Sequence, residues 1–321
     1  MNGLHAEDVL DHYRIERLVA RSGMATIYKA IDEVDGKAVA VKIPHPEMEA
    51  DPVLFDRFKR EQEIGEKLDH PGVMKVYKDD RRKRIYMVME WVEGRLLREE
   101  LKGVKLPPQR AAKIIADICD ALDYVHAHGV THRDMKPENI MIGENDSIKL
   151  IDFGIAGNEG SKRLTFAKLS NVMGTPDYIS PEQVKGKRGD GRSDIYAVGV
   201  MLYEMLTGKV PFNGDNALIT MNERLLNNPI PPRELEPSIT PELQEIIYRA
   251  LERDPKNRYA HAAEMATDLR HQDQVGVAER AELHDWRKKK SQLPGKILMY
   301  IGLGLIPIVI FSLLLWVARR T

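Results

Sequence analysis

The sequence predicts an α+β fold of two lobes, and three observations support this prediction. Short β-branched or alternating runs, bounded by turn residues, dominate the chain up to about residue 92. Helical periodicity dominates from Pro108 onward. The composition is that of a globular protein, because 43% of the residues are apolar and 30% are charged. Strands that precede the helices, rather than alternate with them, favour a small β-rich lobe ahead of a larger helical lobe.

The expected elements follow one another along the chain. Strands of the first lobe are expected at four runs bounded by turns: 13–20, 25–32, 37–44 and 84–92. A helix is expected at 52–69, and its Gly65 should let it move readily, because an interior glycine costs about 1 kcal/mol relative to alanine. The lobes should join near residues 90–97. Helices of the second lobe are expected at 109–129, 193–208, 241–254 and 261–272.

Charge and cysteine content exclude some classes of protein. The net charge of −1 argues against a general nucleic-acid binder, which would carry a basic excess. The single cysteine, Cys119, excludes an intrachain disulfide and a multi-cysteine metal site. It lies at an apolar position of an expected helix, where a small buried side chain is the favoured interpretation. The N-terminus lacks the basic and apolar segments of a secretory signal peptide.

The C-terminal segment has the length of a membrane-spanning helix. Residues 297–318 form a run of 22 residues without a charge, which as a helix would span about 33 Å. Tyr300 and Trp316 lie near its ends, as interfacial aromatic residues do. The basic cluster at 286–290 outweighs the two arginines after the run, so we expect residues 1–295 to be cytoplasmic. A buried core helix is the less favoured alternative, because such uninterrupted apolar runs are rare in soluble domains.

Two motifs in the second lobe carry the strongest chemical signal. The stretch THRDMKPENIM (131–141) holds five polar side chains within eight positions: His132, Arg133, Asp134, Lys136 and Asn139. KLIDFG (149–154) follows, and its aspartate, Asp152, lies thirteen residues after the asparagine. Each residue alone would more often be a surface or capping group, but the joint spacing is highly specific. On these motifs the chain resembles the eukaryotic-like serine/threonine protein kinases.

The resemblance implies the bilobal protein-kinase fold and a role for each residue. Phosphoryl transfer needs metal ions on the phosphates and a carboxylate that orients the attacking hydroxyl. Asn139 and Asp152 are expected to bind Mg²⁺, with Mn²⁺ as a substitute. Asp134 is expected to accept the proton of the substrate hydroxyl. Lys136 is expected to meet the γ-phosphate of ATP, which in this family goes with Ser or Thr substrates rather than Tyr.

The first lobe resembles the ATP-binding elements of the family. VAVK (39–42) resembles the third strand and supplies Lys42, whose expected helix partner is Glu61, with Glu63 as the less favoured competitor. The stretch YMVMEWVEG (86–94) resembles the hinge. Three of its residues are expected at the adenine: Met89 as gatekeeper, Glu90 through its C=O and Val92 through its N–H. Three apolar residues that also belong to the core are expected to enclose the base: Ile27, Ala40 and Met141.

The glycine-rich hairpin that covers ATP in the family is degenerate in this chain. SGMATIY (22–28) resembles the GGMATVY of bacterial transmembrane kinases, which puts Ala20, Ser22 and Ala25 where the family glycines lie. All three are small and Gly23 remains at the tip, so we expect weaker ATP binding or slower turnover rather than their loss. The residues expected to cover ATP are Val19, Ala20, Arg21, Ser22, Gly23, Met24, Ala25, Thr26 and Ile27.

The segment after the second motif is expected to be an activation loop. Thr165 and Ser170 are the better candidates for autophosphorylation, and Ser161 is a further one. Arg133, beside the catalytic aspartate, would bind the resulting phosphate. The alternative is that these hydroxyl groups belong to ordinary loop residues.

Three further residues have structural roles by the same resemblance. Glu182 is expected to form a buried ion pair with Arg258. Asp194 is expected to hold the backbone of the catalytic loop. The basic stretch at 185–191 is interpreted as a surface loop.

These predictions combine into a domain organisation. It has an N-terminal extension (1–12), a kinase domain (13–270, with lobes 13–92 and 93–270), a juxtamembrane linker (271–295), a transmembrane helix (296–318) and a short tail (319–321). With no domain expected beyond the membrane, the input should come from the cytoplasm, from the membrane or through a homodimer.

The sequence therefore predicts a membrane-anchored bacterial kinase that transfers the γ-phosphoryl group of Mg–ATP to Ser or Thr hydroxyls of protein substrates. The alternative is a pseudokinase, a nucleotide-binding signalling scaffold with weakened activity. The degenerate hairpin favours the alternative. The retention of Lys42, Asp134 and Asp152 favours the enzyme.

Overall fold

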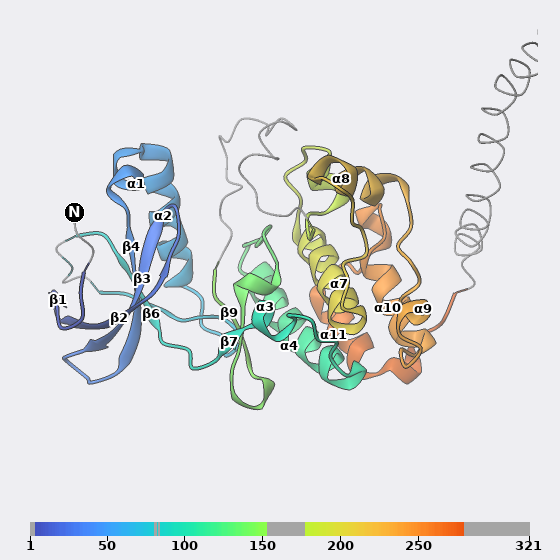
Figure 1. The fold of residues 1–321 in the computed structure, drawn as a ribbon, viewed down its shortest axis with the longest axis horizontal. Helices are drawn as coiled ribbons and strands as arrows, with labels where there is room; N and C mark the ends of the chain where they lie inside the picture. Colours follow the sequence, from blue (N-terminus) through green and yellow to red (C-terminus); the bar gives the residue numbers. More distant parts are fainter. Residues whose placement is uncertain (1–3, 80–81, 83, 153–176, 279–321) are drawn as a thin grey trace, which may run out of the picture.

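The computed structural model describes residues 4–79, 82, 84–152 and 177–278. The chain forms two lobes side by side, a β-rich lobe drawn in blue and a helical lobe drawn in green to orange (Figure 1). The predicted two-lobed α+β architecture is therefore confirmed. Side chains of the predicted strands and helices account for the core of each lobe.

The first lobe is built on one antiparallel sheet. In the part of the chain that the structure describes, its six strands lie in the order β1-β2-β3-β4-β6-β5. Their bounds are Val9–Leu10, Tyr13–Arg21, Ala25–Asp32, Ala38–Pro44, Val76–Tyr77 (β5) and Met87–Glu90 (β6). β6 is shorter than the predicted run 84–92, because only these four residues pair with β4. The two-residue strands β1 and β5 were not predicted.

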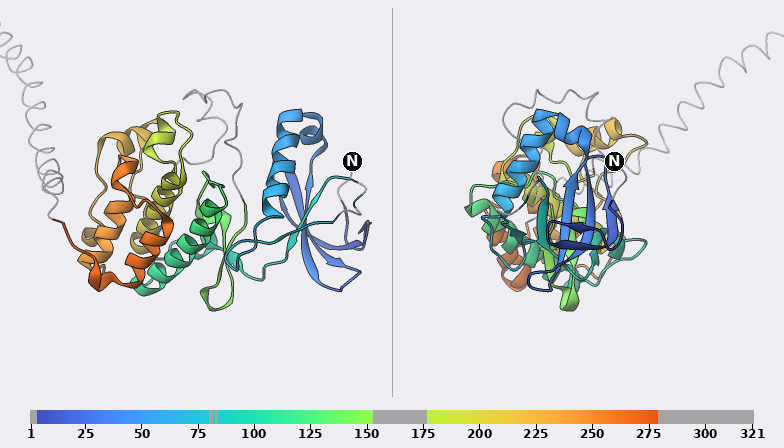
Figure 2. Two further views of the ribbon diagram at one scale, coloured as in Figure 1. Left: turned by 180° about the vertical axis from the view of Figure 1, so that it is seen from behind. Right: turned by 90° about the vertical axis from the view of Figure 1, so that its left-hand side faces the viewer.

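Two helices lie along one face of this sheet, α1 (Pro46–Ala50) and α2 (Pro52–Gly65) (Figure 2). Asp51 begins α2, because its carboxylate accepts hydrogen bonds from the N–H groups of Val53 and Leu54. The helix ends at Gly65, earlier than the predicted residue 69. A Cβ on Gly65 would lie 2.4 Å from Val76 Cγ2. The expectation that Gly65 lies inside the helix is wrong, because this glycine ends the helix and allows it to pack closely against β5. The mobility of the helix stays a prediction.

The second lobe is mainly helical. Its helices are α3 (Leu97–Glu100), α4 (Pro108–Ala127), α6 (Pro181–Val184), α7 (Gly191–Thr207), α8 (Ala217–Leu226), α9 (Pro232–Leu235), α10 (Pro241–Ala250) and α11 (Ala262–Arg270). Short 3₁₀ turns are η1 (Pro137–Asn139), η2 (Glu144–Asp146), η4 (Pro255–Asn257) and η5 (Gln272–Gln274). Helix α4 packs against α7 and α11, and their apolar faces form one core. Cys119 is fully buried in this core, which confirms its interpretation as a small apolar residue.

Helix α7 is buried almost throughout and serves as the support of the catalytic segment. Asp190 caps its first turn by accepting a hydrogen bond from the Arg192 N–H, and Gly208 ends it in the left-handed conformation, with φ of 70°. Asp194 lies in the first turn of this helix and is itself buried. The capped start of α7 therefore fixes the position of a buried carboxylate.

A small antiparallel sheet lies where the lobes meet. It contains β7 (Arg95–Leu96), β8 (Ile140–Ile142) and β9 (Ile148–Leu150). Val73, on the segment between α2 and β5, forms a parallel bridge with Leu150 of β9. The strand that leads to Asp152 is therefore hydrogen-bonded to a segment of the first lobe. Sequence analysis missed these strands because each has only two or three residues.

Candidate active site

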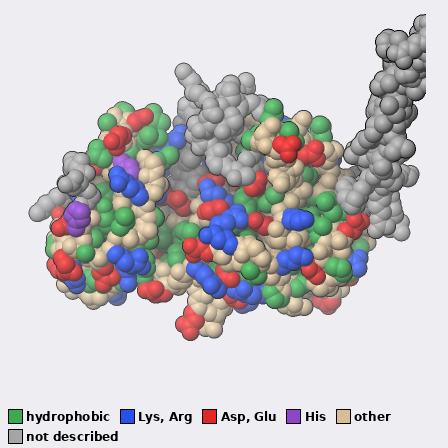
Figure 3. Space-filling view, viewed as in Figure 1, with side chains coloured by type: hydrophobic (Ala, Val, Ile, Leu, Met, Phe, Trp, Pro, Cys, Tyr) green, Lys and Arg blue, Asp and Glu red, His purple; other side chains and the backbone are tan. Residues whose placement is uncertain are grey.

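Lys42 on β4, Glu61 on α2 and Asp152 after β9 come into contact. The surface is hollowed between the two lobes (Figure 3). Alternation along β4 turns Val41 into the core of one sheet face and turns Lys42 to the α2 side. The Lys42 Nζ donates to Glu61 Oε1 at 2.7 Å and to Asp152 Oδ1 at 3.3 Å. Glu63 is exposed. The structure thus brings Lys42 to the expected helix partner and not to the competitor.

The charges in this trio shift one another's pKa values. Burial would lower the pKa of Lys42, but the Asp152 and Glu61 carboxylates outweigh it and raise that pKa above its usual value. Burial raises the pKa of Glu61 to about 8, against the opposing charge of Lys42 and with a further contribution from Asp152. Although burial acts against it, Lys42 keeps the pKa of Asp152 below its usual range. Lys42 and Asp152 are therefore both charged at neutral pH.

Asp194 holds the backbone of the catalytic loop. Its carboxylate accepts hydrogen bonds from the N–H of His132 at 2.9 Å and of Arg133 at 2.7 Å, and from His126 Nε2 at 2.8 Å. Arg133 has a φ of 65°, a left-handed conformation that is unfavourable for a residue with a Cβ. The two N–H bonds to one buried carboxylate stabilise this turn and so direct the next residue, Asp134, toward the cleft.

Asp134 lies within a group of polar side chains. Lys136 Nζ donates to Asp134 Oδ2 at 2.6 Å. Asn139 is buried, and its Nδ2 donates to the Asp134 backbone O at 2.7 Å. The Asn139 backbone O accepts from the Ile151 N–H at 3.0 Å, directly before Asp152. The structure therefore connects the predicted base, the predicted γ-phosphate cation and both predicted metal ligands.

The donor set at this place fits a magnesium ion that arrives with a nucleotide. Mg²⁺ prefers oxygen ligands and is usually held by one or two carboxylates, with phosphates and water completing its shell. Asp152 offers a carboxylate, and Asn139 keeps its amide oxygen because its NH₂ group is used on Asp134. Within the described ranges, no group of three or more His, Cys, Asp or Glu could hold a metal by itself.

The residues predicted to contact adenine lie on β3, β4, β6 and β8 and in the segment after β6. Met89 pairs with Ala40 across β4 and β6, and both are buried in the cluster that Ile27 also contacts. Met141 is half-buried on β8, and Val92 follows β6. These apolar groups lie near the position at which the lobes join.

The Glu90 side chain anchors the hinge, a role that sequence analysis missed. Glu90 Oε1 accepts from Lys149 Nζ at 2.6 Å and from the Lys75 N–H at 2.8 Å. Lys149 belongs to β9 of the second lobe, so this ion pair crosses between the lobes. The only sequence signal for Lys149 is its place as the polar residue of the alternating strand "IKL".

The hairpin expected to cover ATP is closed by Ser22. The Ser22 Oγ accepts from the N–H of Met24 at 3.3 Å and of Ala25 at 3.1 Å. The Ser22 N–H donates to the Ala25 O at 2.9 Å. Ala20 pairs with Ile27 in the ladder. The serine hydroxyl therefore occupies backbone N–H groups that a phosphate could otherwise contact.

The other hairpin residues are in part exposed. Val19 and Met24 have exposed fractions of 40% and 52%, and Arg21 is also exposed. Thr26 is buried, and its hydroxyl lies 2.9 Å from His45 Nε2. A Cβ on Gly23 would meet nothing within 4 Å. The tip of the hairpin is therefore open to solvent, while its base is held to the start of α1.

A second polar network, which sequence analysis also missed, surrounds Arg98. The Arg98 guanidinium donates to Glu138 Oε1 at 2.8 Å and to Glu204 Oε1 at 2.7 Å. It also contacts the hydroxyl of Tyr178, which in turn donates to Glu204. The network joins α3, the 3₁₀ turn after Lys136, α7 and the segment before α6. It therefore supports one side of the catalytic loop.

Glu182 and Arg258 form a buried, bidentate ion pair, as expected. Arg258 Nη1 and Nη2 donate to the two carboxylate oxygens of Glu182, each at 2.7 Å. The Ser193 hydroxyl donates to the same carboxylate at 2.6 Å. Although burial opposes it, the hydrogen bonds from Arg258 lower the pKa of Glu182 to about 2.

Some predicted features lie outside the described residues. These are the candidate phosphorylation sites Ser161, Thr165 and Ser170, and the predicted transmembrane helix at 296–318. Among the residues that the structure does describe, no helix has the length and apolar character needed to cross a membrane.

Comparison with known proteins identifies the family. The family described as the protein kinase domain matches residues 13–272, so the chain belongs to the protein kinase family. The match begins at the predicted start of the domain, residue 13, and ends close to its predicted end, residue 270.

The chain is similar to bacterial serine/threonine kinases, which confirms the resemblance seen in the motifs. It is 38% identical over 265 residues to the serine/threonine-protein kinase PknB of Mycolicibacterium smegmatis, covering 81% of this chain and 42% of that protein. It is 40% identical over 263 residues to a probable serine/threonine-protein kinase of Streptomyces coelicolor, covering 80% of this chain and 39% of that one. The chain thus spans about two fifths of the length of these relatives.

Solved structures show the same fold. The kinase domain of Mycobacterium tuberculosis PknI aligns with a TM-score of 0.66 at 25% identity, over 85% of this chain and 100% of that chain. Rad53 residues 1–466, in complex with AMP-PNP, aligns with a TM-score of 0.63 at 29% identity, over 79% of this chain and 64% of that chain.

The first prediction concerns Glu182. Glu182→Gln should lower the free energy of unfolding at pH 7 by about 3 kcal/mol, because it leaves the Arg258 charge buried without its counter-ion. The folded-state pKa of Glu182, about 2, lies below the usual 4.5, so its stabilisation is full above pH 4.5 and is lost as the pH falls through 2.

Denaturant titrations from pH 7 to pH 2 should therefore show the difference between wild type and Glu182→Gln shrinking below about pH 5. The exposed Glu49→Gln is the control and should change stability by less than about 0.5 kcal/mol. A difference that is constant with pH would contradict the account of this ion pair.

The second prediction concerns the hairpin. Ser22→Gly should tighten ATP binding about two- to tenfold, because it frees the Met24 and Ala25 N–H groups for the phosphates. Ala20→Gly is the matched control and should have a smaller effect, because Ala20 is paired within the ladder. Nucleotide titration of the two variants measures this, and unchanged binding in Ser22→Gly would mean that the departures from glycine are neutral.

Proposed function

We propose that the chain is a serine/threonine protein kinase that transfers the γ-phosphoryl group of ATP to protein hydroxyls. The observation that carries the proposal is the contact of Lys42 Nζ with both Glu61 and Asp152. A lysine held by a helix glutamate and facing the metal-binding aspartate is the arrangement that phosphoryl transfer by protein kinases requires. Membership of the protein kinase family supports the proposal.

In this proposal some residues of the chain position ATP and others bind its charged phosphates. Lys42 binds the ATP phosphates and is oriented by Glu61. Adenine stacks between Ile27, Ala40 and Met141 and bonds to the hinge backbone at Glu90 and Val92. Mg²⁺, or Mn²⁺ in its place, bound at Asn139 and Asp152, would neutralise charge on the phosphates.

The transfer step itself depends on Asp134. The substrate hydroxyl oxygen forms a bond to the γ-phosphorus, the bond from that phosphorus to the bridging oxygen breaks, and ADP leaves. Asp134 orients the hydroxyl and accepts its proton. Lys136, 2.6 Å from Asp134 Oδ2, lies close enough to the same position to meet the γ-phosphate.

The third prediction tests this step. Asp134→Asn should reduce phosphoryl transfer by about 10²- to 10⁴-fold while ATP still binds, because the amide no longer accepts the hydroxyl proton. Incorporation of labelled phosphate from Mg–ATP into the chain and into generic acceptors measures it. The exposed Asp56→Asn is the matched control.

The wild-type outcome decides between the two candidate functions. A wild-type chain that neither binds ATP nor incorporates phosphate would contradict the kinase. ATP binding without transfer would favour the nucleotide-binding scaffold, for which the Ser22-closed hairpin is the supporting observation. Mass spectrometry of the same wild-type sample tests autophosphorylation at Thr165, Ser170 and Ser161.

We also propose that residues 296–318 anchor the chain in a membrane, with the kinase domain on the cytoplasmic side. Support comes from the uncharged run at 297–318 and from the basic cluster that precedes it. The fourth prediction is that the chain stays with the membrane fraction after alkaline extraction. Ile308→Arg should weaken this retention, because a charge at the centre of a span costs about 2.5–3.5 kcal/mol. Full extraction of the wild type would overturn the anchor.

A further inference from the structure

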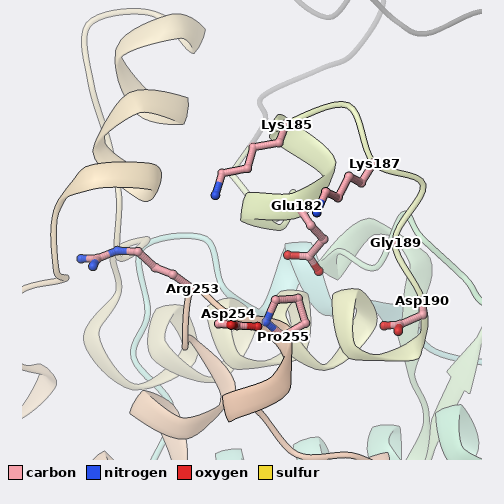
Figure 4. Close-up of a pocket in the computed structure, with 8 residues that line it drawn as sticks. All are labelled: Glu182, Lys185, Lys187, Gly189, Asp190, Arg253, Asp254 and Pro255. Atoms are coloured by element: carbon pink, nitrogen blue, oxygen red, sulfur yellow. The ribbon is translucent and has the colours of Figure 1, made fainter.

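A cavity of about 560 Å³ opens on the second lobe, away from the ATP site. It lies between the loop that follows α6 and the turn that precedes η4 (Figure 4). Lys185 and Lys187 extend from that loop over the cavity, and Asp254 and Pro255 lie on its opposite side. Sequence analysis interpreted the basic stretch at 185–191 as a plain surface loop, but the structure makes it one wall of a cavity.

The cations of this cavity are available to an external anion. Lys185 and Lys187 are exposed, and within the described part of the chain neither ammonium group has an ion pair. Arg253, on the other wall, donates to the side chain of Asn228, a neutral partner. Three cationic side chains therefore line one cavity without an acidic partner in hydrogen-bond contact.

The acidic side chains of the same cavity are already engaged. Both carboxylate oxygens of Glu182 are taken by Arg258. Asp190 accepts from the Arg192 N–H at 3.0 Å, and Asp254 accepts from the Lys256 N–H at 3.0 Å, so each caps a helical turn. With Glu182 neutralised by Arg258, the wall carries a net positive charge.

The backbone fixes the shape of the basic loop. Gly186 and Gly189 have φ of 76° and 73°, which residues with a Cβ rarely adopt. A Cβ on Gly189 would lie 2.3 Å from Ser193 Oγ. The two glycines therefore set the course of the loop close to α7 and hold Lys185 and Lys187 on the cavity side.

The basic loop is bonded directly to the catalytic loop. Gln183 Nε2 donates to the Arg133 O at 3.0 Å, and Arg133 Nε contacts the Gly189 O at 3.4 Å. Burial, and then the nearby charge of Arg188, lower the pKa of Arg133. Two hydrogen bonds thus connect the loop that lines the cavity to Arg133, the residue next to Asp134.

We propose that this cavity is a docking site for an anionic segment of a protein substrate, with Lys185 and Lys187 binding its carboxylate or phosphate groups. Lysine ammonium groups form charge-assisted hydrogen bonds with either group. That the bound protein is a substrate rests on the proposed function, whereas docking itself does not require phosphoryl transfer. Substrates that carry an acidic or already phosphorylated segment are the class that this site favours.

The fifth prediction tests docking without catalysis, on the 321-residue chain carrying Asp134→Asn. Three fluorescent peptides of one sequence are compared by anisotropy, with a cluster of phosphothreonine, glutamate or neutral threonine. The anionic peptides should bind and the neutral one should not. Adding Lys185→Ala and Lys187→Ala should weaken the binding about tenfold. Adding Lys102→Ala and Lys209→Ala, two exposed lysines outside the cavity, removes the same charge and should leave it unchanged.

The outcomes separate docking from the kinase activity. Binding of both anionic peptides supports the proposal, and binding of the phosphothreonine peptide alone supports it and limits the ligand to phosphate. Equal binding of the neutral peptide, or equal losses in the two lysine pairs, overturns it. Binding of phosphatidylglycerol vesicles without binding of any peptide also overturns it. If the wild-type chain transfers no phosphate while the Asp134→Asn chain binds the anionic peptides, the kinase is refuted and the docking site is left intact.

Discussion

The hydrogen bonds to the buried Asp194 carboxylate are the constraint on which the site depends. A buried carboxylate is unfavourable unless donors surround it, and here two backbone N–H groups and one imidazole do so. The same bonds stabilise the left-handed turn at Arg133, which sets the direction of the residues that follow. Because α7 is capped and buried on nearly all sides, the carboxylate has little freedom, and neither has the loop.

Further hydrogen bonds connect the catalytic loop to segments on either side of it. The Gln183 side chain donates to the backbone O of Arg133. The adjacent Glu182 is paired with Arg258, a residue 76 positions further along the chain. Asn139 connects the loop to the strand that ends at Asp152, and Asp152 contacts Lys42 of the first lobe. Each functional side chain is thereby held by a residue distant in sequence. The geometry of the cleft is a property of the whole chain rather than of its motifs.

Sequence analysis located the parts of this arrangement that depend on local spacing. The catalytic motif, the strand of Lys42 and the helix of Glu61 all follow from patterns within a few residues. The bond between Glu90 and Lys149 could not be predicted, because it joins residues 59 positions apart and either alone is an ordinary surface charge. The turn at Ser22 was missed for another reason. A serine at a glycine position indicates only a small side chain, and the bonds it makes depend on the closed hairpin.

The Glu90–Lys149 pair also determines where the nucleotide site can yield. Any motion that parts the lobes at the hinge must break the ion pair between Glu90 and Lys149, whereas the bond from the Lys75 N–H to Glu90 lies within the first lobe. At the other end the hairpin tip is held within the first lobe, where the Met24 O accepts from the His45 N–H at 2.9 Å, although a Cβ on Gly23 would meet nothing within 4 Å. The ion pair between the lobes thus restrains them at the hinge, while the hydrogen bonds described at the hairpin tip hold it to the first lobe.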